Sequence, residues 1–236
     1  MHDQSQRRHL EVDSLVFDLD GTLWDTRPAF AVQASFWNDV VRRYGFAFRE
    51  ITERDVRRLA GRAHEARIRE VFGALTHDQV ASLTSETRAN DHLMRGALRS
   101  SIYAGVALGL KTLSRKYSLY IVSNCQSGYI EKFLELSQLS ALFMDFECRG
   151  NTGRSKAYNL RSVIRRNGLR APAYVGDSQG DQTAASLCEI PFVFAAYGFG
   201  SCDDPIWSID AFGDLSTMVR PFKYHAMTQP TASTTL

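Results

Sequence analysis

Residues 14–26 read SLVFDLDGTLWDT, and this stretch decides the fold. Its first part, from Ser14 to Asp20, is a short apolar run that ends in acidic residues and is followed by Gly21. Such a run is typical of a strand that is buried on both faces and delivers polar groups at its carboxyl end. We therefore expect the chemistry of this protein to begin where this strand ends.

Beyond Gly105 the sequence alternates between helical and strand patterns. Further strands are expected at residues 118–123, 143–148, 173–176 and 192–195, and helices at residues 106–116, 129–139, 156–167 and 181–189. Strands that alternate with helices of about ten residues predict a parallel sheet with helices on both faces. The fold class expected from this pattern is α/β.

The segment between the first strand and this alternating region has a helical pattern throughout. Apolar residues between Pro28 and Tyr44 recur every three or four positions, and Thr52 followed by Asp55 is typical of a helix start. A later apolar series extends to Met94. We expect a core interrupted by an α-helical insert, with the core formed by residues 1–24 and 101–236 and the insert by residues 25–100.

Composition narrows the class of protein. The chain has 236 residues, of which 44% are hydrophobic, so it can bury a core of its own. Its formal net charge of +2 indicates neither nucleic acid nor a membrane surface as a partner. No signal-peptide pattern or transmembrane run is found, and the four cysteines form no C-x-x-C pair. We expect a cytoplasmic protein with reduced thiols, and the sequence does not indicate its oligomeric state.

Polar residues follow several predicted strands, and the carboxyl ends of parallel strands meet at one edge of a sheet. Asp18 and Asp177 offer hard carboxylate oxygens, which suit Mg²⁺. Ser123 and Lys156 can hold the remaining oxygens of a phosphoryl group. The sequence predicts a metal-dependent phosphoryl-transfer site.

Four motifs in this order resemble the phosphatase branch of the haloacid dehalogenase superfamily. They are DLDGTLWDT at 18–26, IVSN at 121–124, Lys156 and GDSQGD at 176–181. The flanking SNCQSGYIEKFLE is similar to the subgroup that includes phosphoglycolate phosphatases and β-phosphoglucomutases. The resemblance implies a Rossmann-like core with a helical cap between the first and second motifs, which agrees with the insert expected from periodicity.

The resemblance also implies roles for individual residues. Asp18 would be the nucleophile that forms an aspartyl-phosphate, and Asp20 would protonate the leaving alcohol and then activate water. Mg²⁺ would contact Asp18, the backbone carbonyl of Asp20 and Asp177, with Asp181 as a supporting or further ligand. The implied phosphate-binding residues are Ser123, Asn124 and Lys156.

Three further residues are open to two interpretations. Arg62 and His64 lie where related caps place a substrate-specificity loop, while the many arginines and acids of the insert favour a solvated helix face for both. Cys125 follows the second motif and could be a reactive thiol, but no base is identifiable near it, so a structural cysteine is expected.

We expect a Mg²⁺-dependent phosphatase that hydrolyses a small phosphoglycolate-like or sugar phosphate monoester. A β-phosphoglucomutase-like phosphosugar mutase is the alternative. A dehalogenase is disfavoured because its halide leaves without the proton that Asp20 would supply, and a receiver-like signalling domain is about half this length and has no cap. A non-catalytic binding protein on the same fold would be expected to have lost a charged site residue, and none is missing here.

Overall fold

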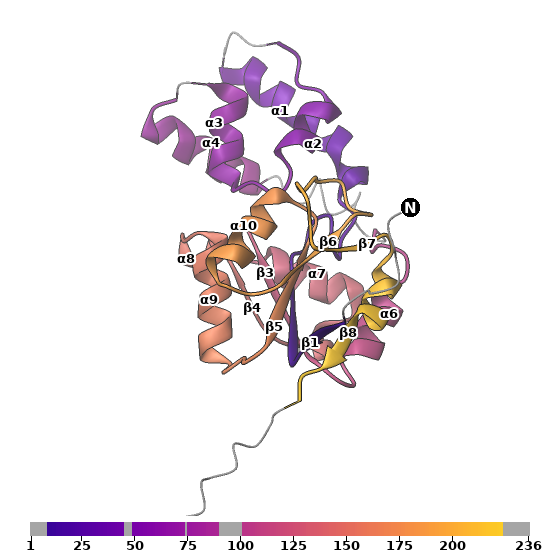
Figure 1. The fold of residues 1–236 in the computed structure, drawn as a ribbon. Helices are drawn as coiled ribbons and strands as arrows, with labels where there is room; N and C mark the ends of the chain where they lie inside the picture. Colours follow the sequence, from indigo (N-terminus) through magenta and orange to yellow (C-terminus); the bar gives the residue numbers. More distant parts are fainter. Residues whose placement is uncertain (1–8, 45–48, 74, 90–100, 224–236) are drawn as a thin grey trace, which may run out of the picture.

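The computed structural model describes residues 9–44, 49–73, 75–89 and 101–223. These form a sheet flanked by helices and, beside it, a lobe of four helices (Figure 1). Met94, to which the last apolar series of the insert extends, lies outside the described residues.

The core sheet has six strands in the order β4-β3-β2-β5-β6-β7, and all neighbours are parallel. This confirms the α/β class. The strands are β2 (Ser14–Phe17), β3 (Ser118–Ser123), β4 (Phe143–Cys148), β5 (Pro172–Gly176), β6 (Phe192–Ala195) and β7 (Trp207–Ile209).

Helices cover both faces of this sheet because side chains along each central strand alternate between the two faces. Leu15 and Phe17 of β2 belong to a buried cluster that includes residues of α6 and α7, whereas Val16 packs with residues of α9 and α10. The core helices are α6 (Val106–Leu113), α7 (Tyr129–Ser137), α8 (Arg149–Thr152), α9 (Lys156–Arg166), α10 (Gln179–Leu187) and α11 (Leu215–Met218). Short 3-10 turns are η2 (Ser140–Leu142) and η3 (Phe212–Asp214).

Two details differ from the sequence-based expectation. Helix α10 begins at Gln179, earlier than expected, because the side chain of Ser178 accepts a hydrogen bond from the Asp181 backbone nitrogen at 3.3 Å and caps the helix. Strand β7 and a separate parallel pair, β1 (Leu10–Val12) and β8 (Val219–Pro221), were not expected. Strands of three residues are too short for a recognisable alternation.

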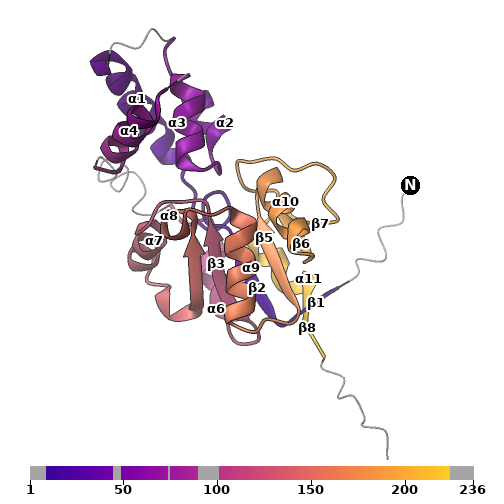
Figure 2. The same cartoon turned by 90° about the vertical axis from the view of Figure 1, so that its left-hand side faces the viewer.

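The four-helix lobe consists of α1 (Phe30–Tyr44), preceded by the 3-10 turn η1 (Arg27–Ala29), α2 (Glu53–Leu59), α3 (His64–Phe72) and α4 (His77–Ala89). It has its own buried cluster, which includes Trp37, Val56 and Ile68. As expected, Thr52 caps α2. Figure 2 shows this lobe, which we call the cap, set above the sheet. The division of the chain after residues 24 and 100 stays a prediction.

The two connections between the core and the cap run side by side. The backbone nitrogen of Asp25 donates to the Ser101 carbonyl at 2.7 Å, and that of Tyr103 donates to the Leu23 carbonyl at 3.3 Å. Trp24 also forms an isolated bridge with Ile102. Because the first connection leaves directly from the end of β2, the cap is joined to the core next to the residues expected to react.

Candidate functional site

Asp18 follows the last residue of β2, and its backbone nitrogen donates to Val175 of the neighbouring strand β5 at 2.8 Å. Lys156, the first residue of α9, places its Nζ 2.9 Å from Asp18 Oδ1 and 2.6 Å from Asp181 Oδ1. All three side chains are buried. The structure therefore brings together residues from the first, third and fourth motifs, as expected from the strand ends.

A cluster of carboxylates surrounds this point. One oxygen each of Asp18, Asp177 and Asp181 lie within 4.8 Å of one another. The Asp177 carboxylate is fixed by the loop after β6, because its Oδ2 accepts hydrogen bonds from the backbone nitrogens of Phe199 at 3.1 Å and Gly200 at 2.9 Å.

Gly21 follows Asp20 and lies directly against Asp177. A Cβ atom on Gly21 would lie 2.0 Å from Asp177 Oδ2, and the residue has a φ of +83°, so the tight turn of the first motif requires glycine here. The approach of this loop therefore fixes the distance between the first and fourth motifs.

Burial and mutual repulsion shift the protonation of these carboxylates. Burial, with a contribution from Asp181, raises the pKa of Asp18 to about 7, although Lys156 opposes the shift. Burial, Asp181 and Asp18 together raise the pKa of Asp177 to about 8. Burial alone would lower the pKa of Lys156, but Asp18 and Asp181 raise it above its ordinary value, so this lysine stays charged.

One lysine cannot neutralise three clustered carboxylates. The cluster offers three carboxyl groups at one buried point, and a cation bound there would allow Asp18 and Asp177 to ionise, which fits a hard divalent cation such as Mg²⁺.

Asp20 lies beside this cluster and is half-buried. Its Oδ1 accepts a hydrogen bond from the Tyr129 hydroxyl at 3.1 Å. Removal from water raises the pKa of Asp20 to about 6, while the Tyr129 hydrogen bond and the charge of Arg67 oppose the rise. A carboxyl group with this pKa can both donate and accept a proton near neutral pH.

Ser123 ends β3 and lines the same cavity as Asp18 and Asp20. Asn124 also lines the cavity, but its side chain donates to the Gly61 carbonyl of the cap at 3.0 Å. Phosphate binding by both residues stays a prediction, and for Asn124 the structure adds a contact that joins the core to the cap.

The cavity has a volume of about 200 Å³ and lies between the core and the cap. Arg62 and His64 line it, as the specificity-loop interpretation requires, although Arg62 forms an ion pair with Glu70. Glu70 also pairs with Arg58, so two arginines share one carboxylate. A role for Arg62 or His64 in substrate recognition stays a prediction.

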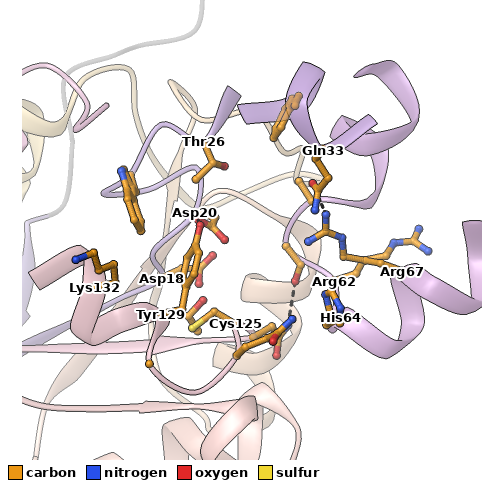
Figure 3. Close-up of a pocket in the computed structure, with 18 of the residues that line it drawn as sticks. Asp18, Asp20, Thr26, Gln33, Arg62, His64, Arg67, Cys125, Tyr129 and Lys132 are labelled. Carbon is orange, nitrogen blue, oxygen red and sulfur yellow. Dashed lines mark hydrogen bonds between the residues drawn. The ribbon is translucent and has the colours of Figure 1, made fainter. Parts of the chain in front are cut away.

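Arg67 of α3 also lines the cavity, whereas the sequence had singled out only Arg62 and His64 in this part of the cap. Its guanidinium donates to Gln33 Oε1 at 2.5 Å and lies 5.1 Å from the centre of the Trp37 ring. Figure 3 shows Arg67, with Gln33, on the cap side of the cavity, across from Asp18 and Asp20. Arg67 lies three residues beyond His64, on the same side of one helix, and this spacing was the available signal.

Two core residues complete the wall of the cavity on the side of Asp20. Tyr129, which the sequence had not singled out either, packs its ring 5.1 Å from that of Trp24, measured between centroids. Cys125 lines the cavity, and burial raises its pKa well above the ordinary thiol value. A thiol in this state is a poor nucleophile, which supports the structural interpretation of Cys125.

The sequence profile of the family described as haloacid dehalogenase-like hydrolase matches residues 15–195. The chain belongs to this family. The match confirms the resemblance drawn from the four motifs and the expectation of a hydrolytic enzyme on a Rossmann-like fold.

Named relatives of this haloacid dehalogenase-like hydrolase fall in the phosphatase branch. The chain is 28% identical to a phosphoglycolate phosphatase of Synechococcus elongatus, over 86% of this chain and 95% of that protein. It is 26% identical to a phosphoglycolate phosphatase of Aliivibrio fischeri, over 80% and 86% of the two chains.

Solved structures support the fold. A haloacid dehalogenase-like hydrolase of Bacteroides fragilis aligns with a TM-score of 0.75 at 20% identity, covering 87% of this chain and all of that one. A phosphoglycolate phosphatase predicted for Haemophilus somnus aligns with a TM-score of 0.70 at 21% identity, covering 90% and 98% of the two chains. Within the described residues, no helix is both long and apolar enough to cross a membrane.

Proposed function

We propose that this protein is a Mg²⁺-dependent phosphatase that hydrolyses a small phosphate monoester through an aspartyl-phosphate on Asp18. The observation that carries the proposal is that Asp18 and Asp20 line one cavity of about 200 Å³, with Lys156 placed 2.9 Å from Asp18. A cavity of this size suits a metabolite rather than a macromolecule.

In the first step, a carboxylate oxygen of Asp18 attacks phosphorus, and the bond from phosphorus to the ester oxygen breaks. Asp20 donates its proton to the departing alkoxide. In the second step, Asp20 takes a proton from water as the water oxygen attacks the aspartyl-phosphate, which frees Asp18 and inorganic phosphate. The pKa of Asp20, about 6, suits both roles.

The other residues around Asp18 bind the phosphoryl oxygens and the metal ion. Lys156 stays protonated and can bind phosphoryl oxygens, as can the Ser123 hydroxyl in the same cavity. The residues that would hold Mg²⁺ are Asp18, Asp177 and Asp181, which form the carboxylate cluster. When bound, Mg²⁺ supplies the positive charge that lets an anionic nucleophile and an anionic phosphate approach each other.

The cap side of the cavity favours a substrate with an anionic organic part. Arg67 presents a guanidinium there, and guanidinium groups bind carboxylates with charge-assisted hydrogen bonds. Lys132 of the core also lines the cavity, but its Nζ pairs with Glu135 at 2.7 Å, so the proposal rests on Arg67. Phosphoglycolate, on which the named relatives act according to their names, carries such a carboxylate, so phosphoglycolate-like esters are the leading substrates.

The function is tested by measuring phosphate release from 2-phosphoglycolate, glycerol phosphate and sugar phosphates, with Mg²⁺ and with a chelator. We expect release that requires Mg²⁺ and is lost in Asp18→Asn. Isomerised sugar phosphate in place of free phosphate would favour a mutase instead. Full turnover in the presence of the chelator would contradict the metal requirement.

The assignment of Asp20 is tested by Asp20→Asn with substrates that differ in leaving group. p-Nitrophenolate leaves with little protonation, so p-nitrophenyl phosphate should give a burst of about one phenolate per site and then stall, because no base activates water. An alkyl phosphate should fail at the first step. Steady turnover of both substrates at the unmodified rate would show that Asp20 has neither role.

A further inference from the structure

Tyr129 is the first residue of α7, and it contacts Asp20 from a position 109 residues away in the chain. Its hydroxyl donates to Asp20 Oδ1 at 3.1 Å. Asp20 is the residue to which we assign proton transfer, so this hydrogen bond bears on the proposed chemistry. Tyr129 itself lies outside the four motifs. Figure 3 shows the two side chains together at the core side of the cavity.

The ring of Tyr129 is held by aromatic packing. Trp24, four residues after Asp20, lies 5.1 Å from Tyr129 and 5.3 Å from Phe133, measured between ring centroids. Only 3% of Trp24 is exposed, so this indole is fixed in the core. Two contacts therefore join the loop that carries Asp20 to the helix that carries Tyr129: the packing of the tilted Trp24 and Tyr129 rings, and the hydrogen bond of the Tyr129 hydroxyl.

The Tyr129 hydroxyl distinguishes the two carboxyl oxygens of Asp20, because it donates to Oδ1. An ordinary phenol keeps its proton near neutral pH, so this bond can form whether or not Oδ2 of Asp20 carries a proton. The bond to Oδ1 leaves Oδ2 of Asp20 as the oxygen that can exchange a proton with substrate or water. A fixed acid is more effective than one that rotates, because proton transfer requires the donor to be aligned with the leaving oxygen.

We propose that Tyr129 is a positioning residue that orients the Asp20 carboxyl for proton transfer. The inference rests on the proposed function, because it assigns Tyr129 a role in the chemistry of Asp20. The competing interpretation is that Tyr129 only packs against Trp24. Removing the hydroxyl distinguishes the two interpretations. Only a positioning role predicts a loss of rate that depends on the leaving group of the substrate.

The test is Tyr129→Phe, which keeps the ring and its packing and removes the hydroxyl. In rapid-quench measurements, we expect aspartyl-phosphate formation from an alkyl phosphate to slow by about 10-fold or more, as part of the 10²–10⁴-fold typical of general acid–base catalysis. Formation from p-nitrophenyl phosphate should change by less than about 2-fold, because that leaving group needs little protonation. Breakdown of the aspartyl-phosphate should slow equally for both substrates, since they share this intermediate.

A matched control is Tyr117→Phe, which removes a hydroxyl from another buried tyrosine of the same hydrophobic cluster. Tyr117 directly precedes β3, so it lies at the amino ends of the strands, whereas the site lies at their carboxyl ends. The rates of Tyr117→Phe with both substrates should therefore equal those of the unmodified protein.

A double-mutant cycle separates positioning from packing. If Tyr129 acts through Asp20, adding Tyr129→Phe to Asp20→Asn should leave the lifetime of the aspartyl-phosphate unchanged. Additive losses, or equal slowing of the first step for alkyl and aryl phosphates, would overturn the inference. Failure of the proposed function itself looks different, because the unmodified protein and Tyr117→Phe would then release no phosphate, or Asp20→Asn would turn over normally.

Discussion

Arg67 and Arg62 lie five positions apart on the cap and line the same cavity, yet their surroundings differ. Arg62 pairs with the carboxylate of Glu70, which cancels much of its charge. Arg67 contacts the amide of Gln33 and the face of Trp37, and its positive charge acts on Asp20, whose pKa it lowers. Arg67, whose charge reaches the reacting end of the cavity, is the cap residue that we propose binds the anionic part of the substrate.

Replacing Arg67 with Met tests this difference. We expect Arg67→Met to lower kcat/KM for 2-phosphoglycolate by about 10- to 100-fold, the loss typical of a hydrogen bond to a charged group. The value for glycerol phosphate, whose organic part is neutral, should change by less than about 2-fold. Arg69→Met, an exposed arginine of the same helix, is the matched control in the same steady-state assays and should behave as the unmodified protein. Equal losses with both substrates would show that Arg67 supports the cap rather than substrate selection.

Site residues at the ends of strands could be predicted from the sequence, whereas site residues on helices could not. Asp18, Ser123 and Asp177 follow or end predicted strands, and parallel strands necessarily bring their carboxyl ends together, so their proximity could be predicted. Tyr129 and Arg67 reach the cavity from helices, and their direction depends on how those helices pack. No local pattern reports that packing, so neither residue was singled out as part of the site.

The loop after β6 is the element that positions Asp177. Its backbone provides the two hydrogen bonds from Phe199 and Gly200, and Gly198 allows the loop to approach closely. A Cβ atom on Gly198 would lie 2.4 Å from Asp177 Cβ and 2.5 Å from the Gly21 carbonyl oxygen. Both distances are too short for a real contact, so even alanine must displace the carboxylate or the loop.

Gly198→Ala should therefore weaken metal binding without removing a ligand. Displacing groups that orient a ligand typically costs about 10- to 100-fold in metal affinity, and we expect a rise of that size in the Mg²⁺ concentration for half-maximal activity. Gly213→Ala is the matched control, because a Cβ atom there meets nothing within 4 Å. An unchanged Mg²⁺ requirement in Gly198→Ala would mean that the loop yields without moving Asp177.

The elements themselves were predictable to the extent that their signals were local. The alternation of helices and strands after Gly105 indicated the parallel sheet, and Thr52 marked the start of α2 correctly. The start of α10 was predicted too late, because Asp181 was taken as the first residue of the helix. In the structure Ser178 is the N-cap residue and Asp181 is the third helical residue, and the two form a capping box. The loop after β6 carried no indication of its contact with Asp177, since that contact is made by backbone groups.

At the scale of the whole molecule, the site is shared between two lobes. The ring of Phe30 in the cap packs 5.3 Å from that of Phe199 in the core, measured between centroids, and Arg149 of the core lies 3.8 Å from Glu65 of the cap. Helical periodicity alone predicted a helical insert, but the position of this insert next to the site followed only from the family resemblance. Contacts between surfaces distant in sequence leave no periodic pattern from which they could be read.

The buried carboxylates should also make the stability of the whole molecule depend on pH and on metal. In the metal-free protein the pKa is about 7 for Asp18 and about 8 for Asp177, compared with 3.8 for both groups when unperturbed. At a pH above 3.8 and below the raised pKa, each of these carboxyl groups keeps its proton in the folded state and has lost it in the unfolded state. The free energy of unfolding should therefore fall as pH rises from about 4 to about 8.

Mg²⁺ should reverse this trend, because it replaces those protons and binds more tightly as the carboxyl groups ionise. In thermal unfolding with a chelator, we expect Tm to be lower at about pH 8 than at about pH 6, and added Mg²⁺ to raise Tm more at the higher pH. Asp177→Asn removes one of the three carboxyl groups whose pKa is raised, together with one proposed ligand, so it should reduce both the pH dependence and the Mg²⁺ effect. If Mg²⁺ raised Tm equally at both pH values, or not at all, proton release from the carboxylate cluster would not be coupled to metal binding, and the assignment of these residues as the Mg²⁺ site would fail.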